Sequence, residues 1–181
     1  MRQIHRVLWL EGLVILILAF VVANFPAQAA DTSQHTSFLK KLSGTWKGRG
    51  ILRRKLSANK EPVSCRLDGN WKDGRLNLTY ICLGVDVRFE SKGFLAYKAT
   101  TNRYTGTWYT SGQSTQARVE GTKNGNRLNL ILNGKHPKTS KPVSSKLVIS
   151  LRSAARLVNT IRTRDTKTGK TFELFAVTFK R

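Results

Sequence analysis

The sequence predicts an all-β protein, an antiparallel up-and-down barrel of about ten strands preceded by one short helix. Apolar and polar residues alternate along nearly the whole chain after residue 44, as in strands that have one buried face. Residues that tolerate turn dihedrals separate these runs, among them Asp73-Gly74 and Asn124-Gly125. Long helical periods are absent from this part of the sequence. We favour a closed barrel over a β-sandwich, because closure leaves no exposed edge strand.

The predicted elements follow one another with short connections. Residues 32–43 are expected to form the helix, within a leader at residues 30–43. A single barrel domain of ordinary size then occupies residues 44–181. Its predicted strands cover residues 45–52, 62–71, 75–83, 85–98, 103–110, 115–122, 127–133, 145–152, 156–164 and 171–180.

Residues 1–29 have the composition of a secretory signal peptide. Two arginines precede an apolar run at residues 12–23, and Ala27-Gln28-Ala29 supplies the small residues for cleavage after Ala29. The apolar run is shorter than the roughly 20 residues that a membrane-spanning helix needs. We therefore expect an exported bacterial protein, in the periplasm or outside the cell, whose mature chain has no transmembrane segment.

The clearest hairpin turns at Asp73-Gly74. With these two residues as the turn, Lys72 faces Arg75, and this register places Cys65 opposite Cys82. The cysteines then form a non-hydrogen-bonded pair, in which Cα atoms lie about 4.5 Å apart, a separation that a disulfide accepts. Because export favours oxidation, we predict a Cys65–Cys82 disulfide. The same face of the hairpin holds Leu67, Trp71, Leu76, Leu78 and Tyr80.

The start of the barrel domain resembles known families. The run Gly44-Thr45-Trp46-Lys47-Gly48-Arg49-Gly50 is similar to the Gly-x-Trp opening of calycin barrels, the lipocalins and fatty-acid-binding proteins, and to the longer opening of nitrobindin-like haem barrels. The strand pattern agrees over residues 43–181. The resemblance implies that Trp46 plugs the closed end of the barrel beneath a basic residue of the last strand, Lys180 or Arg181. Such a cation–π pair contributes roughly 1 kcal/mol.

The sequence departs from these families where they bind their ligands. Only residues 53–62 lie between the first two strands, where fatty-acid-binding proteins have a two-helix lid. The last strand lacks the Arg-x-Tyr that grips a fatty-acid carboxylate. No histidine follows His136, whereas nitrobindin-like proteins bind haem iron through a late histidine. The resemblance therefore implies the fold but neither fatty acid nor haem, and we expect no cofactor.

The aromatic residues fall on strand faces that can line a barrel interior. Barrels of this size either fill with side chains or hold one small ligand, and a ligand site needs a few polar groups among apolar walls. Asn159 and Arg162 lie on opposite faces of one strand, so one of them points inward. An inward Arg162 suits an anionic head group, because a buried charge needs a partner, whereas an inward Asn159 suits a neutral group. The candidate interior residues are Trp46, Trp71, Tyr80, Phe89, Tyr104, Trp108, Asn159 and Arg162.

The chain is strongly basic. It contains 32 Lys and Arg against 10 Asp and Glu, a formal net charge of +22, which exceeds what solubility alone requires. Residues 134–146 and 162–170 concentrate these cations in two connections that should share one end of an up-and-down barrel. A basic surface attracts anions, and export argues against nucleic acid as the partner. The predicted basic rim comprises Lys135, Lys138, Lys141, Lys146, Arg164, Lys167 and Lys170.

The sequence lacks the common motifs of catalysis. It contains no Gly-x-Ser-x-Gly elbow, no His-Glu-x-x-His and no phosphate-binding glycine loop. His35 and His136 have no Cys or second His at the spacing of metal ligands. We expect a non-enzymatic monomer without a metal, which holds a small hydrophobic or amphipathic, anionic ligand in the barrel. The alternative is a solid-cored barrel whose surface binds polyanions of the cell envelope, such as lipopolysaccharide, anionic lipid or acidic polysaccharide.

Overall fold

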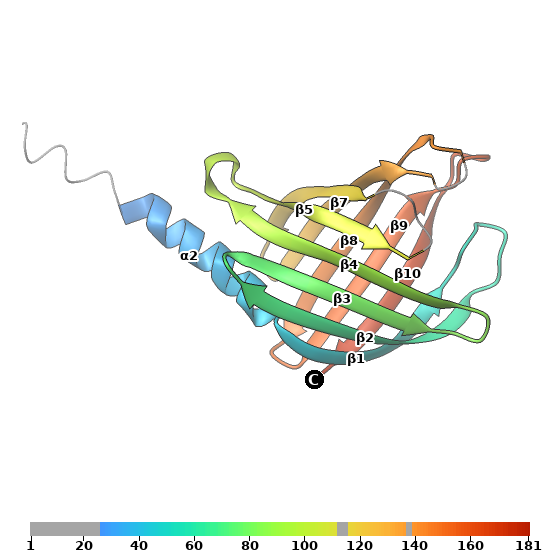
Figure 1. The fold of residues 1–181 in the computed structure, drawn as a ribbon, viewed down its shortest axis with the longest axis horizontal. Coiled ribbons are helices and arrows are strands. Elements are labelled where there is room, and N and C mark those ends of the chain that lie inside the picture. Colours follow the sequence, from blue (N-terminus) through green and yellow to red (C-terminus); the bar gives the residue numbers. More distant parts are fainter. Residues whose placement is uncertain (1–25, 112–115, 137–138) are drawn as a thin grey trace, which may run out of the picture. The chain divides into compact units, whose positions relative to one another are not determined.

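The computed structural model describes residues 26–111, 116–136 and 139–181, and these form a closed antiparallel barrel of ten strands and one α-helix (Figure 1). The chain divides into two units between Gln34 and His35, and the barrel belongs to the second. The elements are α2 (Pro26–Lys41), β1 (Gly44–Leu52), β2 (Glu61–Lys72), β3 (Arg75–Leu83), β4 (Arg88–Lys98), the 3₁₀ turn η2 (Ala99–Thr101), β5 (Arg103–Thr110), β6 (Ala117–Asn124), β7 (Arg127–Lys135), β8 (Pro142–Ser153), β9 (Arg156–Arg164) and β10 (Thr171–Lys180).

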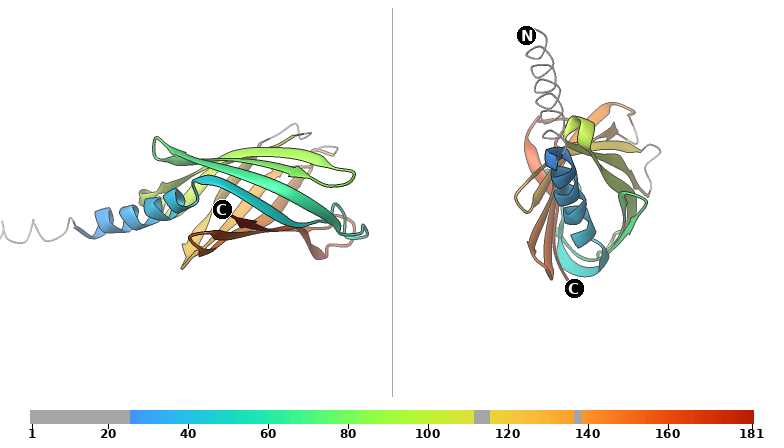
Figure 2. Two further views of the ribbon diagram at one scale, coloured as in Figure 1. Left: turned by 90° about the horizontal axis from the view of Figure 1, so that it is seen from below. Right: turned by 90° about the vertical axis from the view of Figure 1, so that its left-hand side faces the viewer.

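The predicted fold class is confirmed. Each strand pairs with its neighbours in the chain, and β1 pairs with β10 to close the barrel. The end-on view in Figure 2 shows the strands surrounding one interior. β4 begins at Arg88 rather than at residue 85, because Gly84 N donates to Val87 O in a turn (2.8 Å) and Val85 is exposed.

The helix α2 is longer at its start than the sequence predicts. It runs from Pro26 to Lys41, whereas the sequence predicts residues 32–43. The helix ends where Leu42 N and Ser43 N donate to carbonyls three residues earlier, and basic residues in its last turn suit the helix dipole. Residues 1–25 of the expected signal peptide lie outside the described residues. No helix in the described part of the chain has the length and apolar character needed to cross a membrane.

The barrel has two ends that differ in their connections. The tight turns after β2, β4, β6 and β8 lie at one end, which residues His35–Leu42 cover and which we call the helix end. The connections after β1, β3, β7 and β9 lie at the opposite end, called the open end below (Figure 1), and all except the one after β3 are longer than the connections at the helix end. An up-and-down topology places every second connection at the same end, so all four of these loops share the open end.

Two glycines of the opening motif allow β1 to meet β10. Gly48 pairs with Phe179, and Gly50 pairs with Val177. A Cβ atom at Gly48 would lie 2.7 Å from Cδ1 of Phe179, and one at Gly50 would overlap the backbone of β10. Because glycine has no Cβ, the side chains of Phe179 and Val177 extend across β1 into the interior, where both are buried.

A bulge in β10 explains why the last strand is apolar on both of its faces. The pairing with β9 shifts between Glu173 and Phe175, which leaves Leu174 as the extra residue. Phe172 and Phe175 are an odd number of positions apart and would face opposite sides of a regular strand. The bulge turns both side chains into the interior, where they are buried.

The predicted disulfide between Cys65 and Cys82 is confirmed. Asp73 and Gly74 both have positive φ, 51° and 75°, as a tight two-residue hairpin turn requires. The β2–β3 register pairs Cys65 with Cys82, whose Cα atoms are 4.1 Å apart, and the two sulfur atoms are bonded. This bond is consistent with an exported protein. The cysteine face of the hairpin also holds Leu67, Trp71, Leu76, Leu78 and Tyr80.

We expect the disulfide to stabilise the barrel by constraining the unfolded chain. It joins residues 17 positions apart, for which the chain-entropy model predicts about 3 kcal/mol. The double variant Cys65→Ala/Cys82→Ala should lose up to about this much unfolding free energy in urea denaturation. Dithiothreitol should destabilise the wild type but not the variant. Equal stability of the two proteins without reductant would contradict the expectation.

Candidate ligand-binding site

The helix end of the barrel is sealed by packed side chains. The residues of α2 and of the turn after it that face the barrel recur at the spacing of one helix face, and they are His35, Phe38, Leu39 and Leu42. His35 stacks on Tyr97, with ring centroids 4.0 Å apart and an interplanar angle of 3°. Its Nδ1 lies 2.8 Å from the hydroxyl of Tyr104, which is itself fully buried. This end therefore admits no solvent to Tyr104.

Trp46 lies beneath Arg181 at this end, as the resemblance to calycin barrels implies. The indole of Trp46 is fully buried and donates from Nε1 to the carbonyl of Leu42 at 3.0 Å. Cζ of Arg181 lies 4.0 Å from the centroid of the Trp46 ring. The guanidinium also donates to the carbonyl of Lys41 at 2.9 Å and to that of Ser43. Arg181 thus satisfies the carbonyl of the last helical residue, which the helix leaves free, and that of Ser43 two residues beyond it.

We expect Arg181→Ala to destabilise the barrel by about 1–2 kcal/mol, because it removes a cation–π contact and two hydrogen bonds. Arg181→Lys should give an intermediate loss, since an ammonium cannot stack and bridge as a guanidinium does. The matched control is Lys180→Ala, which removes the same charge from an exposed neighbour. Urea denaturation of the three variants measures the effect. A loss no larger for Arg181→Ala than for Lys180→Ala would contradict the expectation.

On several strands, inward-facing side chains become more exposed toward the open end. Along β10 the exposed fraction rises from 0% at Phe179 through 1% at Val177 and 4% at Phe175 to 8% at Phe172. The half-buried inward-facing residues nearest the open end are apolar or carry a hydroxyl. They are Phe89, Thr110, Ala117, Val143, Ile161 and Thr163. Solvent therefore reaches the inner wall from the open end.

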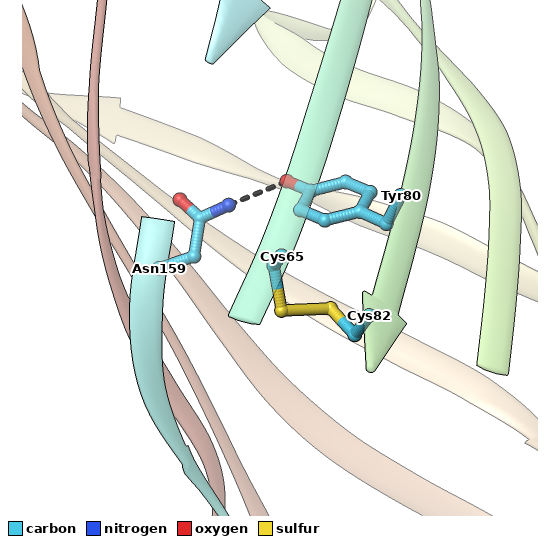
Figure 3. Close-up of a disulfide and its surroundings, with 4 residues drawn as sticks. All are labelled: Cys65, Tyr80, Cys82 and Asn159. Atoms are coloured by element: carbon cyan, nitrogen blue, oxygen red, sulfur yellow. Dashed lines mark hydrogen bonds between the residues drawn. A yellow bond between two sulfur atoms is a disulfide. The ribbon is translucent and has the colours of Figure 1, made fainter. Parts of the chain in front are cut away.

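A polar pair crosses the interior between these two regions. Asn159 of β9 and Tyr80 of β3 are both buried, and β10, β1 and β2 separate their strands around the wall. The Asn159 amide donates to the Tyr80 hydroxyl at 2.5 Å, so the bond spans the barrel instead of following the sheet (Figure 3). The Tyr80 ring contacts Trp108 and Phe179, with centroids 5.3 and 6.0 Å away. Burial raises the pKa of the Tyr80 phenol, which therefore stays protonated.

One atom of this pair has no hydrogen-bond partner among the described residues. Oδ1 of Asn159 is buried and accepts no hydrogen bond from the described residues. The Tyr80 hydroxyl accepts from the amide, and its own proton has no acceptor in this part of the chain. Leaving a buried acceptor unpaired costs about 1–3 kcal/mol. The pair thus offers an acceptor and a donor in the interior.

The predicted interior residues lie at three levels of the barrel. Trp46, Trp71 and Tyr104 belong to the helix end. Tyr80, Trp108 and Asn159 meet near its middle. Phe89 is half-buried near the open end and makes an edge-on contact with Phe175, with centroids 6.0 Å apart.

Arg162 does not point into the barrel. It is exposed on the outer face, where it pairs with Lys146 of β8 and Glu173 of β10. Of the two residues, Asn159 therefore points inward and Arg162 points outward. The prediction that Arg162 lines the interior is wrong. A guanidinium inside this wall would lose its hydration without gaining a counter-charge. The buried polar residues of the described chain are Ser91, Ser150 and Asn159, none of which is charged.

The described members of the basic rim are exposed and lie at the open end. They are Lys135, Lys141, Lys146, Arg164, Lys167 and Lys170, whereas Lys138 lies outside the described residues. None of these six forms a salt bridge with another described residue. Asp165 accepts hydrogen bonds from Thr168 and Lys167, which lower the pKa of its carboxyl. Its negative charge is therefore held within its own loop.

The sequence indicates no role for His35 beyond that of an isolated, unsupported metal ligand. The structure places it in a ring stack that covers Tyr104. The helical spacing of residues 35, 38, 39 and 42 is the signal that could have indicated a packed face. Among the described residues, no group of three or more His, Cys, Asp or Glu side chains could hold a metal ion.

The sequence matches one protein-family model over most of its length. The family model described as "Protein of unknown function (DUF1579)" matches residues 31–181, which is the whole barrel and the last part of α2. The chain belongs to the DUF1579 family. No curated protein matches the sequence.

Two solved structures resemble this DUF1579 barrel. Rv2717c from M. tuberculosis is 15% identical with a TM-score of 0.61, over 80% of this chain and 95% of that protein. The S-type phycobiliprotein lyase CPES from Guillardia theta is 9% identical with a TM-score of 0.51, over 80% of this chain and 90% of that protein. At these identities the likeness concerns the fold alone.

The second neighbour corrects one expectation from the sequence. CPES is a phycobiliprotein lyase, so a barrel of this kind is compatible with enzymatic activity. The expectation that the DUF1579 chain is not an enzyme is therefore wrong as drawn. It depended on the absence of short motifs, but a barrel can bring reacting groups together from separate strands without any local motif.

Proposed function

We propose that this DUF1579 barrel binds a small hydrophobic or amphipathic molecule that enters through the open end. The observation that supports the proposal is the asymmetry of the interior. Trp46, Tyr104 and Phe179 at the helix end are fully buried, whereas several inward-facing apolar side chains at the open end, among them Phe89 and Ile161, are partly exposed. Small-molecule sites are typically concave, mostly apolar and supplied with few polar groups. The wall near the open end has this composition.

The proposal includes a location outside the cytoplasm. The Cys65–Cys82 disulfide and the signal-like composition of residues 1–29 both support export. The ligand would then be a molecule available in the periplasm or outside the cell.

Ala117 offers a direct test of binding in the interior. It faces inward near the open end, paired with Trp108, and Gly134 faces it on the next strand. We expect Ala117→Leu to weaken the binding of the apolar dye N-phenyl-1-naphthylamine by about tenfold, because the added methyl groups occupy space in the wall. A fluorescence titration measures the affinity, and circular dichroism confirms that the variant is folded.

Arg118→Leu is the matched control, since Arg118 is the exposed neighbour of Ala117 on the same strand. This variant should bind the dye as the wild type does. A wild type that does not bind the dye, or an equal loss in both variants, would contradict the proposed function.

The second candidate function is binding of an anionic envelope surface by the basic rim. The supporting observation is that the rim cations are exposed and lack salt bridges within the described chain. In addition, Lys146 lies directly opposite Arg162 on the outer face. Like charges in such a pair are destabilising, with Glu173 beside Arg162 as partial compensation. An anionic partner would relieve this repulsion.

Charge reversal tests this second candidate. We expect the triple variant Lys135→Glu/Lys141→Glu/Lys146→Glu to bind phosphatidylglycerol vesicles at least roughly a hundredfold more weakly, since each lysine near an anionic surface contributes about 1 kcal/mol. Its affinity should also depend less on salt than that of the wild type. Vesicle sedimentation over a series of NaCl concentrations measures both effects.

The control for net charge reverses three exposed cations at the helix end, Lys72, Arg127 and Arg156, to glutamate. It changes the total charge by the same amount but leaves the rim intact. An equal loss of binding in both triple variants would indicate a general charge effect and would contradict a role for the rim.

A further inference from the structure

We infer that the Asn159–Tyr80 pair recognises an uncharged hydroxyl group on the ligand, so that the barrel prefers an alcohol to the corresponding methyl ether. The inference rests on the proposed function, because it specifies the chemistry of the molecule that occupies the interior. Beyond that function, the Asn159–Tyr80 pair is the contact point for the neutral part of the ligand, and any acidic part binds elsewhere.

The hydrogen-bonding capacity of the pair matches a hydroxyl group. Oδ1 of Asn159 needs a donor, and the proton of the Tyr80 hydroxyl needs an acceptor. A hydroxyl both donates and accepts, so one ligand group can serve Asn159 and Tyr80 together. An ether has no proton to donate and leaves Oδ1 unpaired.

The remaining polar groups of the interior do not compete for this role. Ser91 and Thr110 have hydroxyl oxygens 2.9 Å apart, and Ser145 donates to Thr163 at 3.0 Å. These hydroxyls are therefore satisfied by one another. The other buried side-chain atom without a partner in the described chain is Oγ of Ser43, which lies beside the helix end.

The charge distribution excludes an anionic group from the Asn159 position. No buried residue of the described chain is charged, and the described rim cations are exposed at the open end. A carboxylate beside Asn159 would lose its hydration without a counter-charge, which is costly. An acidic group on the ligand would instead stay at the basic rim. The neutral hydroxyl and the acidic group thus belong to different levels of the barrel.

The test compares three competitors of N-phenyl-1-naphthylamine, namely decan-1-ol, decyl methyl ether and decanoate. The wild type should bind the alcohol about threefold to tenfold more tightly than the ether, the difference expected from about one additional hydrogen bond. In the double variant Tyr80→Phe/Asn159→Leu this preference should disappear. Decanoate should bind both proteins equally, because its carboxylate stays at the rim.

The two substitutions of the double variant are chosen so that the protein still folds. It replaces both polar partners with apolar groups of similar size, a change that is often close to neutral for stability, and its melting temperature is measured alongside binding. The matched control is Tyr109→Phe/Asn133→Leu, which makes the same two replacements at exposed, outward-facing positions. This control should retain the preference for the alcohol.

The outcomes separate the inference from the proposed function. If the wild type binds the alcohol and the ether equally, or if the double variant keeps the preference, then the Asn159–Tyr80 pair does not select a hydroxyl group and the inference is wrong. Binding of the dye would still support the proposed function in that case. If the wild type binds neither the dye nor any competitor, the proposed function fails and the inference fails with it.

Discussion

The pairing of the first strand with the last is the constraint on which the rest of the structure depends. Without the β1–β10 ladder, a ten-stranded sheet would expose two long edges, and its inner face would have no opposite wall. Gly48 and Gly50 permit the close approach, and Phe179 and Val177 then fill the space above them. Arg181 follows directly and joins Trp46 to the end of the helix. Closure of the wall and sealing of one end are thus parts of the same arrangement.

Because only the helix end is sealed, the two ends of the barrel differ in what can enter them. Buried aromatic and aliphatic side chains occupy the sealed half, and a hydrogen bond between β3 and β9 crosses the middle. Toward the open end the inner wall becomes partly exposed, and lysine and arginine side chains surround it. A ligand within the barrel and an anionic surface outside it would both approach from this end. The two candidate functions therefore use different groups on the same side of the molecule.

Local patterns predicted most of the fold. Alternation of apolar and polar residues defined the strands to within a few residues, and a two-residue turn set the β2–β3 register, which in turn brought Cys65 to Cys82. These features depend on neighbours close in the chain. The bulge at Leu174 was not predicted, because a strand that is apolar on both faces carries no sign of where its alternation shifts. The contact by which His35 covers Tyr104 was not predicted, because it joins two segments that are distant in the chain.

The sequence by itself determined the ten-stranded antiparallel architecture, the disulfide and the excess of positive charge, because alternation, turn residues and composition are local properties. Only the tertiary structure decided that Asn159 points inward and Arg162 outward, and that Arg181 rather than Lys180 covers Trp46. It also brought Asn159 to Tyr80, 79 residues away in the chain. The physical reason is that the interior belongs to no single strand. Which side chains meet there depends on how the whole sheet closes, and no short stretch of sequence specifies that.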